Sequence, residues 1–288
     1  MVPTLRISLI QFQPKPLSPE VNFNIASSKI RDAAASGCHL AVLPEYHLTS
    51  WVPSDPGFPA SCLEAESYLP QYQALAKDLD IHIVPGTILT QRSPSSASSP
   101  ELHNMAYLLA AGTGEILASY QKRNLWHPER GILTAGVKSP HTAFDLPIPG
   151  TDMTIRAGLL ICWDLAFPEA FRELAIRGGA ELVIIPAWWH ITEVDPAVKK
   201  LNPDSEAVFL DGIAVARAFE NTCAVALCNS FGRSQVVVPI SGRLGALAVD
   251  EEGEVACEVD FETLRVAEEA YKVRADVSQE GWYGRQGS

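Results

Sequence analysis

The sequence predicts an α/β protein in which β-sheets are covered by helices. Short apolar segments of strand length alternate along the chain with segments whose apolar residues recur at the helical period. Hydrophobic residues make up 47% of the chain and charged residues 19%, as in ordinary globular proteins. At 288 residues the chain is long enough to bury about three quarters of the surface of its unfolded state, so we expect a substantial core.

The expected elements follow from short apolar runs bounded by turn residues and from longer amphipathic stretches. The predicted strands are residues 5–12, 39–43, 82–89, 106–111, 116–121, 155–161, 182–186, 223–229, 244–249 and 255–259. The predicted helices are residues 22–36, 65–79, 169–177 and 205–220.

Two segments read as strand, glycine-containing turn and strand, and we predict a β-hairpin for each: MAYLLAAGTGEILASYQK (105–122) and LGALAVDEEGEVACEV (244–259). Gly112 and Gly114 lie in the first of these turns. A dinucleotide-binding fingerprint would instead place its glycines at the start of a helix. We therefore expect no cofactor here or elsewhere.

The chain reads as one domain, residues 1–270, followed by a C-terminal tail, residues 271–288, that could contribute to an oligomer interface. The Ser- and Pro-rich segment QRSPSSASSP (91–100) is expected to be a flexible surface loop rather than a domain linker. No internal repeat is evident.

Composition excludes several classes of partner. A net charge of -12 without a basic run argues against nucleic-acid binding, which uses clustered Lys and Arg. No segment reaches the roughly 18 to 20 continuous apolar residues that cross a bilayer, and the N-terminus lacks the features of a secretory signal. We therefore expect a soluble protein. The cysteines show no CxxC spacing, so we also expect reduced thiols, no metal site and a cytoplasmic location.

Cys162 is the first candidate for chemistry. In GLLICWDLAFPE (158–169) it stands at the end of an apolar strand, followed by a turn into a helix expected near Pro168. Backbone N–H groups and the positive end of a helix dipole favour a thiolate at such a position. Buried cysteines are, however, more often structural, so context has to decide.

Two further polar residues stand at strand ends. Glu45 follows the apolar strand of AVLPEYHLTSW (41–51), and Lys122 follows the second strand of the first hairpin. Each residue alone is more often an ordinary surface residue. A thiol nucleophile also needs a base, for which histidine is the usual residue; a Cys-His arrangement stays open, although no histidine lies in a recognisable protease motif.

Glu, Lys and Cys in this order at strand ends resemble the pattern of the nitrilase superfamily, the carbon-nitrogen hydrolases. The resemblance covers almost the whole chain. Four segments carry it: LPEYHLT (43–49), YQKRNLWHPE (120–129), GLLICWDLAFPEAFRELAIRGGAELVIIPAWW (158–189) and ARAFENTCAVALCNSFG (216–232).

The resemblance implies a four-layer α-β-β-α sandwich and a hydrolase that cleaves an amide-like carbon-nitrogen bond through a cysteine thioester. It implies that Glu45 is the general base, Cys162 the nucleophile and Lys122 the cation that stabilises the oxyanion, together with the N–H group of Trp163. Glu129 matches a second glutamate that positions the lysine or the substrate. Family members usually pair, so we expect a homodimer or larger assembly.

Substrate class is less constrained. Cys162-Trp163-Asp164 followed by Phe-Pro-Glu looks more like the amidase branches than like the nitrilases, which usually carry Trp-Glu after the cysteine. Nitrilase and N-carbamoyl hydrolase activities remain alternatives. Ala166 departs from the arginine of many amidase-like members, so any contact made by that arginine must be absent or supplied elsewhere.

The expected substrate is a small amide-like molecule, in a pocket lined by residues that follow the motifs or strand ends. The candidates are Tyr46, Trp51, Trp126, His127, Trp188, Trp189 and His190. Residues 190–209 are expected to pass over the pocket mouth. Two other classes are weighed: a catalytically silent binding or scaffold protein of the same fold, and an acyltransferase of the same superfamily.

Overall fold

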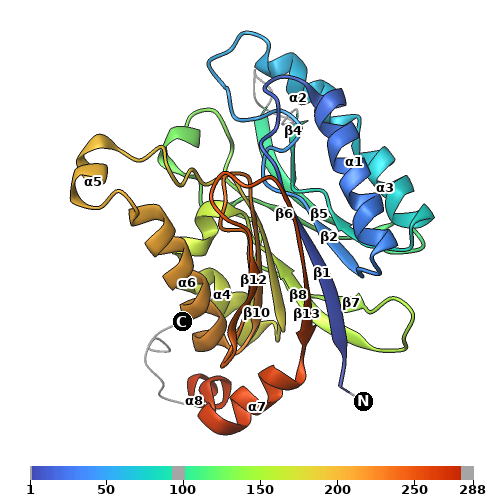
Figure 1. Cartoon of the computed structure of the whole chain (residues 1–288), viewed down its shortest axis with the longest axis vertical. Coiled ribbons are helices and arrows are strands. Elements are labelled where there is room, and N and C mark those ends of the chain that lie inside the picture. Colours follow the sequence, from blue (N-terminus) through green and yellow to red (C-terminus); the bar gives the residue numbers. More distant parts are fainter. Residues whose placement is uncertain (1, 93–100, 280–288) are drawn as a thin grey trace.

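The computed structural model describes residues 2–92 and 101–279. Two β-sheets face each other at the centre of the molecule, and helices cover their outer faces (Figure 1). Strand β1 of one sheet packs against β10 of the other. The arrangement is the predicted four-layer α-β-β-α sandwich.

The first sheet has the strand order β13-β1-β2-β3-β5-β4, with β6 paired to β5. Its inner strands β1, β2 and β3 run parallel, and β13 and β5 pair antiparallel to this group. Its strands are β1 (Thr4–Gln11), β2 (Leu40–Val42), β3 (His82–Val84), β4 (Thr87–Arg92), β5 (Glu101–Leu109), β6 (Ile116–Gln121) and β13 (Gly253–Asp260).

The second sheet has the strand order β12-β11-β10-β9-β8-β7, with β8, β9 and β10 parallel at its centre. Strands β9 and β10 read as nearly continuous apolar runs because both of their faces are buried. Its strands are β7 (Phe144–Pro147), β8 (Thr154–Leu159), β9 (Leu182–Ala187), β10 (Ala224–Asn229), β11 (Gln235–Val238) and β12 (Gly242–Ala246).

Strand β1 shows how the sequence builds the layers. Leu5, Ile7 and Leu9 join the core between the two sheets, whereas Ile10 joins the core beneath the outer helices. Successive side chains of a strand point to opposite faces, so β1 contributes to both cores, although Arg6 and Ser8 share the outer face with Ile10. Helices α1 (Pro19–Ala35) and α3 (Leu69–Asp78) cover the outer face of this sheet.

The outer face of the second sheet is covered by α6 (Ser205–Asn221), which packs on β10 and β11, and by α4 (Pro168–Phe171) beside it (Figure 1). The chain from α4 continues as a π-helical segment, η3 (Arg172–Arg177). The remaining helices are α2 (Phe58–Glu66), α5 (Pro196–Leu201), α7 (Glu262–Tyr271) and α8 (Val273–Ser278).

Two predicted elements are divided in the structure. The strand expected at 82–89 is interrupted at Gly86, which has φ +52° and separates β3 from β4. The helix expected at 65–79 is divided between α2 and α3 by a turn at Ser67 and Tyr68. In both cases the apolar residues continue through the turn, so the sequence pattern did not reveal the break between the two elements.

The predicted hairpin at 105–122 is confirmed, since β5 and β6 pair antiparallel. The predicted hairpin at 244–259 is wrong, because β12 pairs with β11 in one sheet and β13 pairs with β1 in the other. Strands β7 and β11 and helix α5 were not predicted; each is four to six residues long, too short for a clear periodic signal.

The expected tail begins inside the C-terminal helical region, because α7 ends at Tyr271 and α8 follows it. The Arg274 guanidinium donates hydrogen bonds to the carbonyls of Ala180, Asn221 and Thr222 and so ties α8 to the sandwich. Residues 280–288 of the tail, and residues 93–100 of the expected surface loop, lie outside the described residues. The division into a domain and an interface-forming tail stays a prediction.

Within the ranges that the structure describes, no helix has the length and apolar character needed to cross a membrane.

Candidate active site

The ends of several strands from both sheets meet at one cavity of about 600 Å³. Glu45 follows β2 and Lys122 directly follows β6, both in the first sheet. Cys162 follows β8 and Trp188 directly follows β9, both in the second sheet. All four residues line the cavity, so residues up to 143 positions apart in sequence are brought together.

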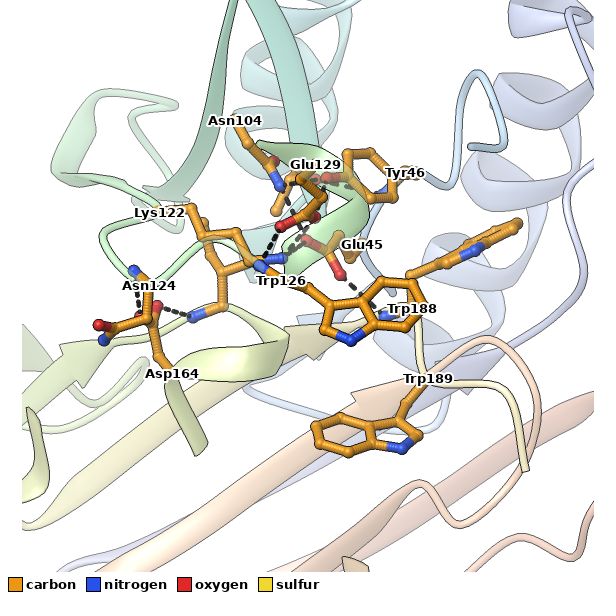
Figure 2. Close-up of polar contacts among 12 residues, drawn as sticks. Glu45, Tyr46, Asn104, Lys122, Asn124, Trp126, Glu129, Asp164, Trp188 and Trp189 are labelled. Atoms are coloured by element: carbon orange, nitrogen blue, oxygen red, sulfur yellow. Dashed lines mark hydrogen bonds and ion pairs between the residues drawn. The ribbon is translucent and has the colours of Figure 1, made fainter. Parts of the chain in front are cut away.

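Lys122 lies between two carboxylates (Figure 2). Its Nζ donates to Oε1 of Glu45 at 2.8 Å and to Oε1 of Glu129 at 2.6 Å. The side chains of Lys122 and Glu45 are 1% exposed and that of Glu129 is 3% exposed. A charge this deeply buried is stable only when it is paired and hydrogen-bonded, and these contacts meet that condition.

The Glu45 carboxylate is held by further donors. The side-chain amide of Asn104 donates to Oε1 at 2.8 Å, and the backbone N–H of Trp188 donates to Oε2 at 3.0 Å. The backbone carbonyl of Pro44 lies so close to Gly86 that a Cβ built there would be 1.9 Å from its oxygen. The loop that carries Glu45 is therefore fixed by side-chain contacts and by close backbone packing.

Glu129 connects Lys122 to the aromatic side of the cavity. Its Oε1 also accepts a hydrogen bond from the Tyr46 hydroxyl, and its Oε2 accepts one from the backbone N–H of Trp126 at 2.8 Å. Asn104 donates to the same Tyr46 hydroxyl at 3.0 Å. Glu129 is thus placed to fix the position of the Lys122 ammonium group.

Cys162 occupies a strained turn. It has φ +45°, a left-handed conformation that is uncommon for a residue with a Cβ, and it begins the 3-10 turn η2 (Cys162–Ala166). Asp164 in this turn accepts hydrogen bonds from the N–H of Ile161 at 3.0 Å and from the hydroxyl of Tyr120 at 2.9 Å. These bonds hold the turn in the shape that points the thiol into the cavity.

Asp164 also connects the cysteine turn to the lysine loop. Its Oδ1 accepts bonds from the backbone N–H and the side-chain amide of Asn124, two residues after Lys122, at 3.0 and 2.8 Å (Figure 2). Burial raises the pKa of the Asp164 carboxyl, and the N–H donors of Ile161 and Asn124 oppose that rise. The two segments are therefore fixed relative to each other through one buried side chain.

The environment of Cys162 differs from the sequence-based expectation. Burial raises the pKa of the thiol well above its ordinary value, Glu45 and Glu129 raise it further, and Lys122 and the N–H of Trp188 lower it only in part. The expectation of a stabilised thiolate is therefore wrong for the resting site. The N-terminus of the expected helix also does not lie directly after Cys162, because η2 separates Cys162 from the short helix α4.

The pKa of Glu45 is raised too, first by burial and then by Glu129, against the lowering effects of Lys122 and Cys162. Burial alone would lower the pKa of Lys122, but Glu45, Cys162 and Glu129 together raise it above its ordinary value. The site thus places a neutral thiol beside a carboxyl group of raised basicity and a permanently charged ammonium group, an arrangement suited to transferring the thiol proton to Glu45.

Six of the seven predicted substrate-binding residues line the cavity: Tyr46, Trp51, Trp126, Trp188, Trp189 and His190. His127 does not. It is exposed at the start of the 3-10 turn η1 (His127–Glu129), with its ring against that of Trp126 at 5.0 Å. The turn carries Glu129 inward and leaves His127 outside. Trp163 also lines the cavity.

Residues 190–209 pass over the cavity as expected and contribute several lining residues. They are His190, Glu193, Val194, Asp195, Val198, Ser205, Glu206 and Phe209. Helix α5 lies within this segment, beside the mouth.

Ala166 is not among the lining residues. A guanidinium group reaches this position from α6 instead: Arg217 donates to the carbonyls of Leu165 and Ala166 at 3.2 and 3.1 Å and lies over the ring of Phe171. A helix distant in sequence therefore supplies a structural contact at the turn.

Sequence reasoning missed Asn104 and left Asp164 without a role. Asn104 lies in β5 directly after His103 and ahead of the strand predicted at 106–111, so no local pattern singled it out, and Asp164 was quoted only as part of the cysteine motif. Among residues 2–92 and 101–279, no group of three or more His, Cys, Asp or Glu side chains is arranged to hold a metal ion.

Comparison with known proteins agrees with this geometry. The family model described as carbon-nitrogen hydrolase matches residues 6–272. A 2-oxoglutaramate amidase of Bacillus subtilis is 26% identical over 226 residues, covering 75% of each chain. An omega-amidase of Xenopus tropicalis is 26% identical over 281 residues, covering 93% of each chain.

Solved structures include an amidase from Nesterenkonia sp. AN1, with a TM-score of 0.71 at 26% identity, covering 91% of this chain and 95% of that one. That structure shows the product of Michael addition of acrylamide at its active-site cysteine. The family match over nearly the whole chain, the shared fold and the amidase relatives lead to one conclusion: this chain belongs to the carbon-nitrogen hydrolase family and is an amidase-like enzyme.

Proposed function

We propose that the protein hydrolyses the amide bond of a small molecule through an acyl-enzyme formed on Cys162. The observation that carries this proposal is the placement of Cys162, Glu45 and Lys122 on one cavity, with Lys122 and Glu45 in direct contact. A thiol, a base and a fixed cation are the groups that acyl transfer needs.

The first half of the reaction uses all three groups. Glu45 takes the thiol proton as the sulfur of Cys162 bonds to the amide carbon. The negative charge that develops on the carbonyl oxygen is stabilised by the Lys122 ammonium and by the backbone N–H of Trp163. Such a donor typically contributes about 10² to 10³ in rate. Glu45 then returns its proton to the leaving ammonia or amine, and a thioester remains.

The second half repeats this proton transfer with water. Glu45 takes a proton from a water molecule as the water oxygen attacks the thioester carbon. Glu45 then returns the proton to the sulfur of Cys162 as the acid product leaves. Glu129 acts through Lys122: by accepting one of its N–H bonds at 2.6 Å, it fixes the ammonium where the oxyanion forms.

The relatives favour an amide over a nitrile or a carbamoyl compound. The Nesterenkonia enzyme has been solved with butyramide bound, and the omega-amidase and 2-oxoglutaramate amidase names point to the same reaction. A nitrilase from Pyrococcus abyssi, 26% identical over 64% of each chain, keeps nitrile hydrolysis as the second candidate.

The test is ammonia release from a panel of small amides, N-carbamoyl compounds and nitriles. We expect the amides to be hydrolysed and Cys162→Ala to lose turnover while keeping the circular dichroism spectrum of the wild type. Cys257→Ala, which removes a thiol outside the cavity, is the matched control and should stay active.

The same panel tests the other classes. Turnover by Cys162→Ala at the wild-type rate would remove the nucleophile assignment. A wild-type protein that binds an amide without releasing ammonia would indicate the silent binding protein, and faster product formation with an added amine than with water would indicate an acyltransferase.

Self-association is inferred on separate grounds. Val208, Val215 and Phe219 form an exposed apolar stripe on α6, with Tyr271 of α7 against Phe219 at 5.0 Å. Light scattering of the purified protein tests whether this face pairs two copies. A cytoplasmic location is inferred from the six cysteines, which are free and buried, as is typical of proteins in reducing compartments.

A further inference from the structure

The wall of the cavity formed by residues 193–209 is acidic. Among the described residues that line the cavity, Lys122 is the only lysine or arginine, and its charge is already engaged by Glu45 and Glu129. The wall formed by residues 193–209 adds Glu193, Asp195 and Glu206. These three carboxylates have no lysine or arginine opposite them within the cavity.

Glu206 is fixed at the end of a row of aromatic rings. The indole N–H of Trp189 donates to its Oε2 at 2.6 Å. The Trp189 ring stacks on Phe209 at 5.3 Å and lies against Trp163, also at 5.3 Å between ring centroids. Since Trp163 directly follows Cys162, the rings form a continuous apolar path from the thiol to the Glu206 carboxylate.

Two oxygen atoms at the end of this path lack a partner within the described parts of the chain. Oγ of Ser205 is buried without a hydrogen bond, although Ser205 lines the cavity. Oε1 of Glu206 has no hydrogen bond or ion pair, while its Oε2 is engaged by Trp189. A buried hydroxyl without a partner carries a desolvation cost that a donor on a ligand would remove.

Carboxylates beside aromatic faces are the chemistry that recognises an organic ammonium group. The faces of tryptophan and phenylalanine attract a cation, a carboxylate accepts strong charge-assisted hydrogen bonds from it, and a neighbouring hydroxyl accepts another. A substrate carboxylate, by contrast, would meet three like charges and find no free lysine or arginine on this wall.

We propose that the cavity wall formed by residues 193–209 binds the ammonium end of an ω-amino amide, with Glu206 as its main contact. The chain of this substrate lies along the Trp163, Trp189 and Phe209 rings, so that its amide carbonyl reaches Cys162. This rests on the proposed amidase function and specifies its substrate class. Glu206 holds the ammonium directly, with Ser205 as a second acceptor, while Glu193 and Asp195 lower the potential at the mouth. Glu193 also pairs with Nδ1 of His190 at 3.3 Å.

Three amides of similar length separate charge from size: 5-aminopentanamide, pentanamide and 4-carbamoylbutanoate. At low salt and neutral pH we expect kcat/KM to be at least about tenfold higher for the cationic amide than for the neutral one, and lowest for the anionic one. The preference for the cation should shrink as salt is raised, because exposed Glu193 and Asp195 contribute through screened interactions.

Glu206→Gln tests the residue. Glutamine keeps an oxygen that can accept the Trp189 N–H bond, so the wall retains its shape and loses one charge. We expect the ratio of kcat/KM for the cationic amide to that for the neutral amide to fall about tenfold. Glu258→Gln, the same change at an exposed position on β13 outside the cavity, should leave this ratio unchanged.

Binding to Cys162→Ala by calorimetry keeps the two proposals separable. Hydrolysis of all three amides without preference for the cation, or equal binding of 5-aminopentanamide and pentanamide, would overturn the ammonium site and leave the amidase intact. Preferential binding of the cationic amide that disappears with Glu206→Gln supports the ammonium site. This holds even if the wild type hydrolyses none of the three amides, a result that would remove the amidase proposal alone.

Discussion

Lys122 and Glu45 form an ion pair inside the protein, with 2.8 Å between Nζ and Oε1 and both side chains 1% exposed. One arises at the end of β6 and the other after β2, and Glu129 contacts the same ammonium group. The pair therefore joins two distant segments and couples the stability of the site to its chemistry.

The first prediction concerns removal of this cation. Lys122→Met leaves Glu45 and Glu129 buried without a positive partner, and we expect a loss of about 3 to 5 kcal/mol in the free energy of unfolding, measured in urea, together with loss of amide hydrolysis. Adding Glu129→Gln should restore part of the stability and none of the activity. Wild-type stability in Lys122→Met would contradict the role given to the pair.

The second prediction concerns the thiol. Burial, Glu45 and Glu129 raise the pKa of Cys162, so its thiolate should form only above pH 9.0, as read from ultraviolet absorbance of the wild type minus that of Cys162→Ala. Glu45→Gln should move this titration to lower pH because a nearby negative charge is gone, while amide turnover is lost with the base. A midpoint below pH 8 in the wild type would show that a resting thiolate is present after all.

The third prediction is the acid limb of activity. Burial raises the pKa of Glu45 above its ordinary value of 4.5, and a general base must be ionised to accept a proton. We expect kcat/KM for a neutral amide to fall with decreasing pH at a midpoint above 4.5, with the ammonium of Lys122 still protonated throughout this range because its pKa is raised. Glu258→Gln should give the same profile, and a limb at or below 4.5 would argue against Glu45 as the base.

The fourth prediction concerns the backbone beneath Glu45. A Cβ at Gly86 would lie 1.9 Å from the Pro44 carbonyl oxygen in a residue with φ +52°, so Gly86→Ala must displace the Glu45 loop. Gly150→Ala is the matched control: its φ is +74°, but a Cβ there meets nothing within 4 Å. We expect the control to cost about 1 to 2 kcal/mol of stability through backbone strain alone, and Gly86→Ala to cost more and to lower kcat as well.

The fifth prediction concerns Asp164 as a positioning residue. Asp164→Asn replaces one acceptor oxygen by a donor where N–H groups of Ile161 and Asn124 point inward. We expect kcat to fall about 10²-fold with a smaller change in KM, because the Cys162 turn shifts relative to Lys122. Asp152→Asn, an exposed aspartate ahead of β8, should change neither constant. If Asp164→Asn and Asp152→Asn lowered kcat to the same extent and the melting temperature to the same extent, Asp164 would have no specific role in positioning the Cys162 turn.

Much of this site was accessible from the sequence because its residues stand at strand ends. Glu45, Lys122 and Cys162 each follow an apolar run, and such runs predict buried strands whatever the rest of the chain does. Glu129 was named because the resemblance to the carbon-nitrogen hydrolases implies a second glutamate there. His127, in the same motif, was assigned wrongly to the cavity, since a 3-10 turn rotates neighbouring residues to different sides and spacing alone does not reveal the turn.

Other features depend on contacts between distant segments. Asn104 reaches Glu45 only because β5 lies beside the loop that follows β2, and Arg217 reaches Ala166 from α6. Residues 244–259 were predicted as a hairpin, yet the two strands in this segment, β12 and β13, pair with strands of different sheets. Pairing between strands is decided by the whole sheet, and local turn signals cannot supply it.

The sequence by itself determined the layered α/β architecture, because apolar periodicity is a local property of the chain, and the resemblance of its motifs to the carbon-nitrogen hydrolases identified the three groups proposed for catalysis. Tertiary structure decided the direction in which the pKa of each of those groups is shifted, and it decided the charge of the cavity wall. Both depend on burial and on neighbours from distant segments: Glu45 and Glu129 raise the pKa of Cys162, and residues 193–209 bring Glu206 to the end of the aromatic path.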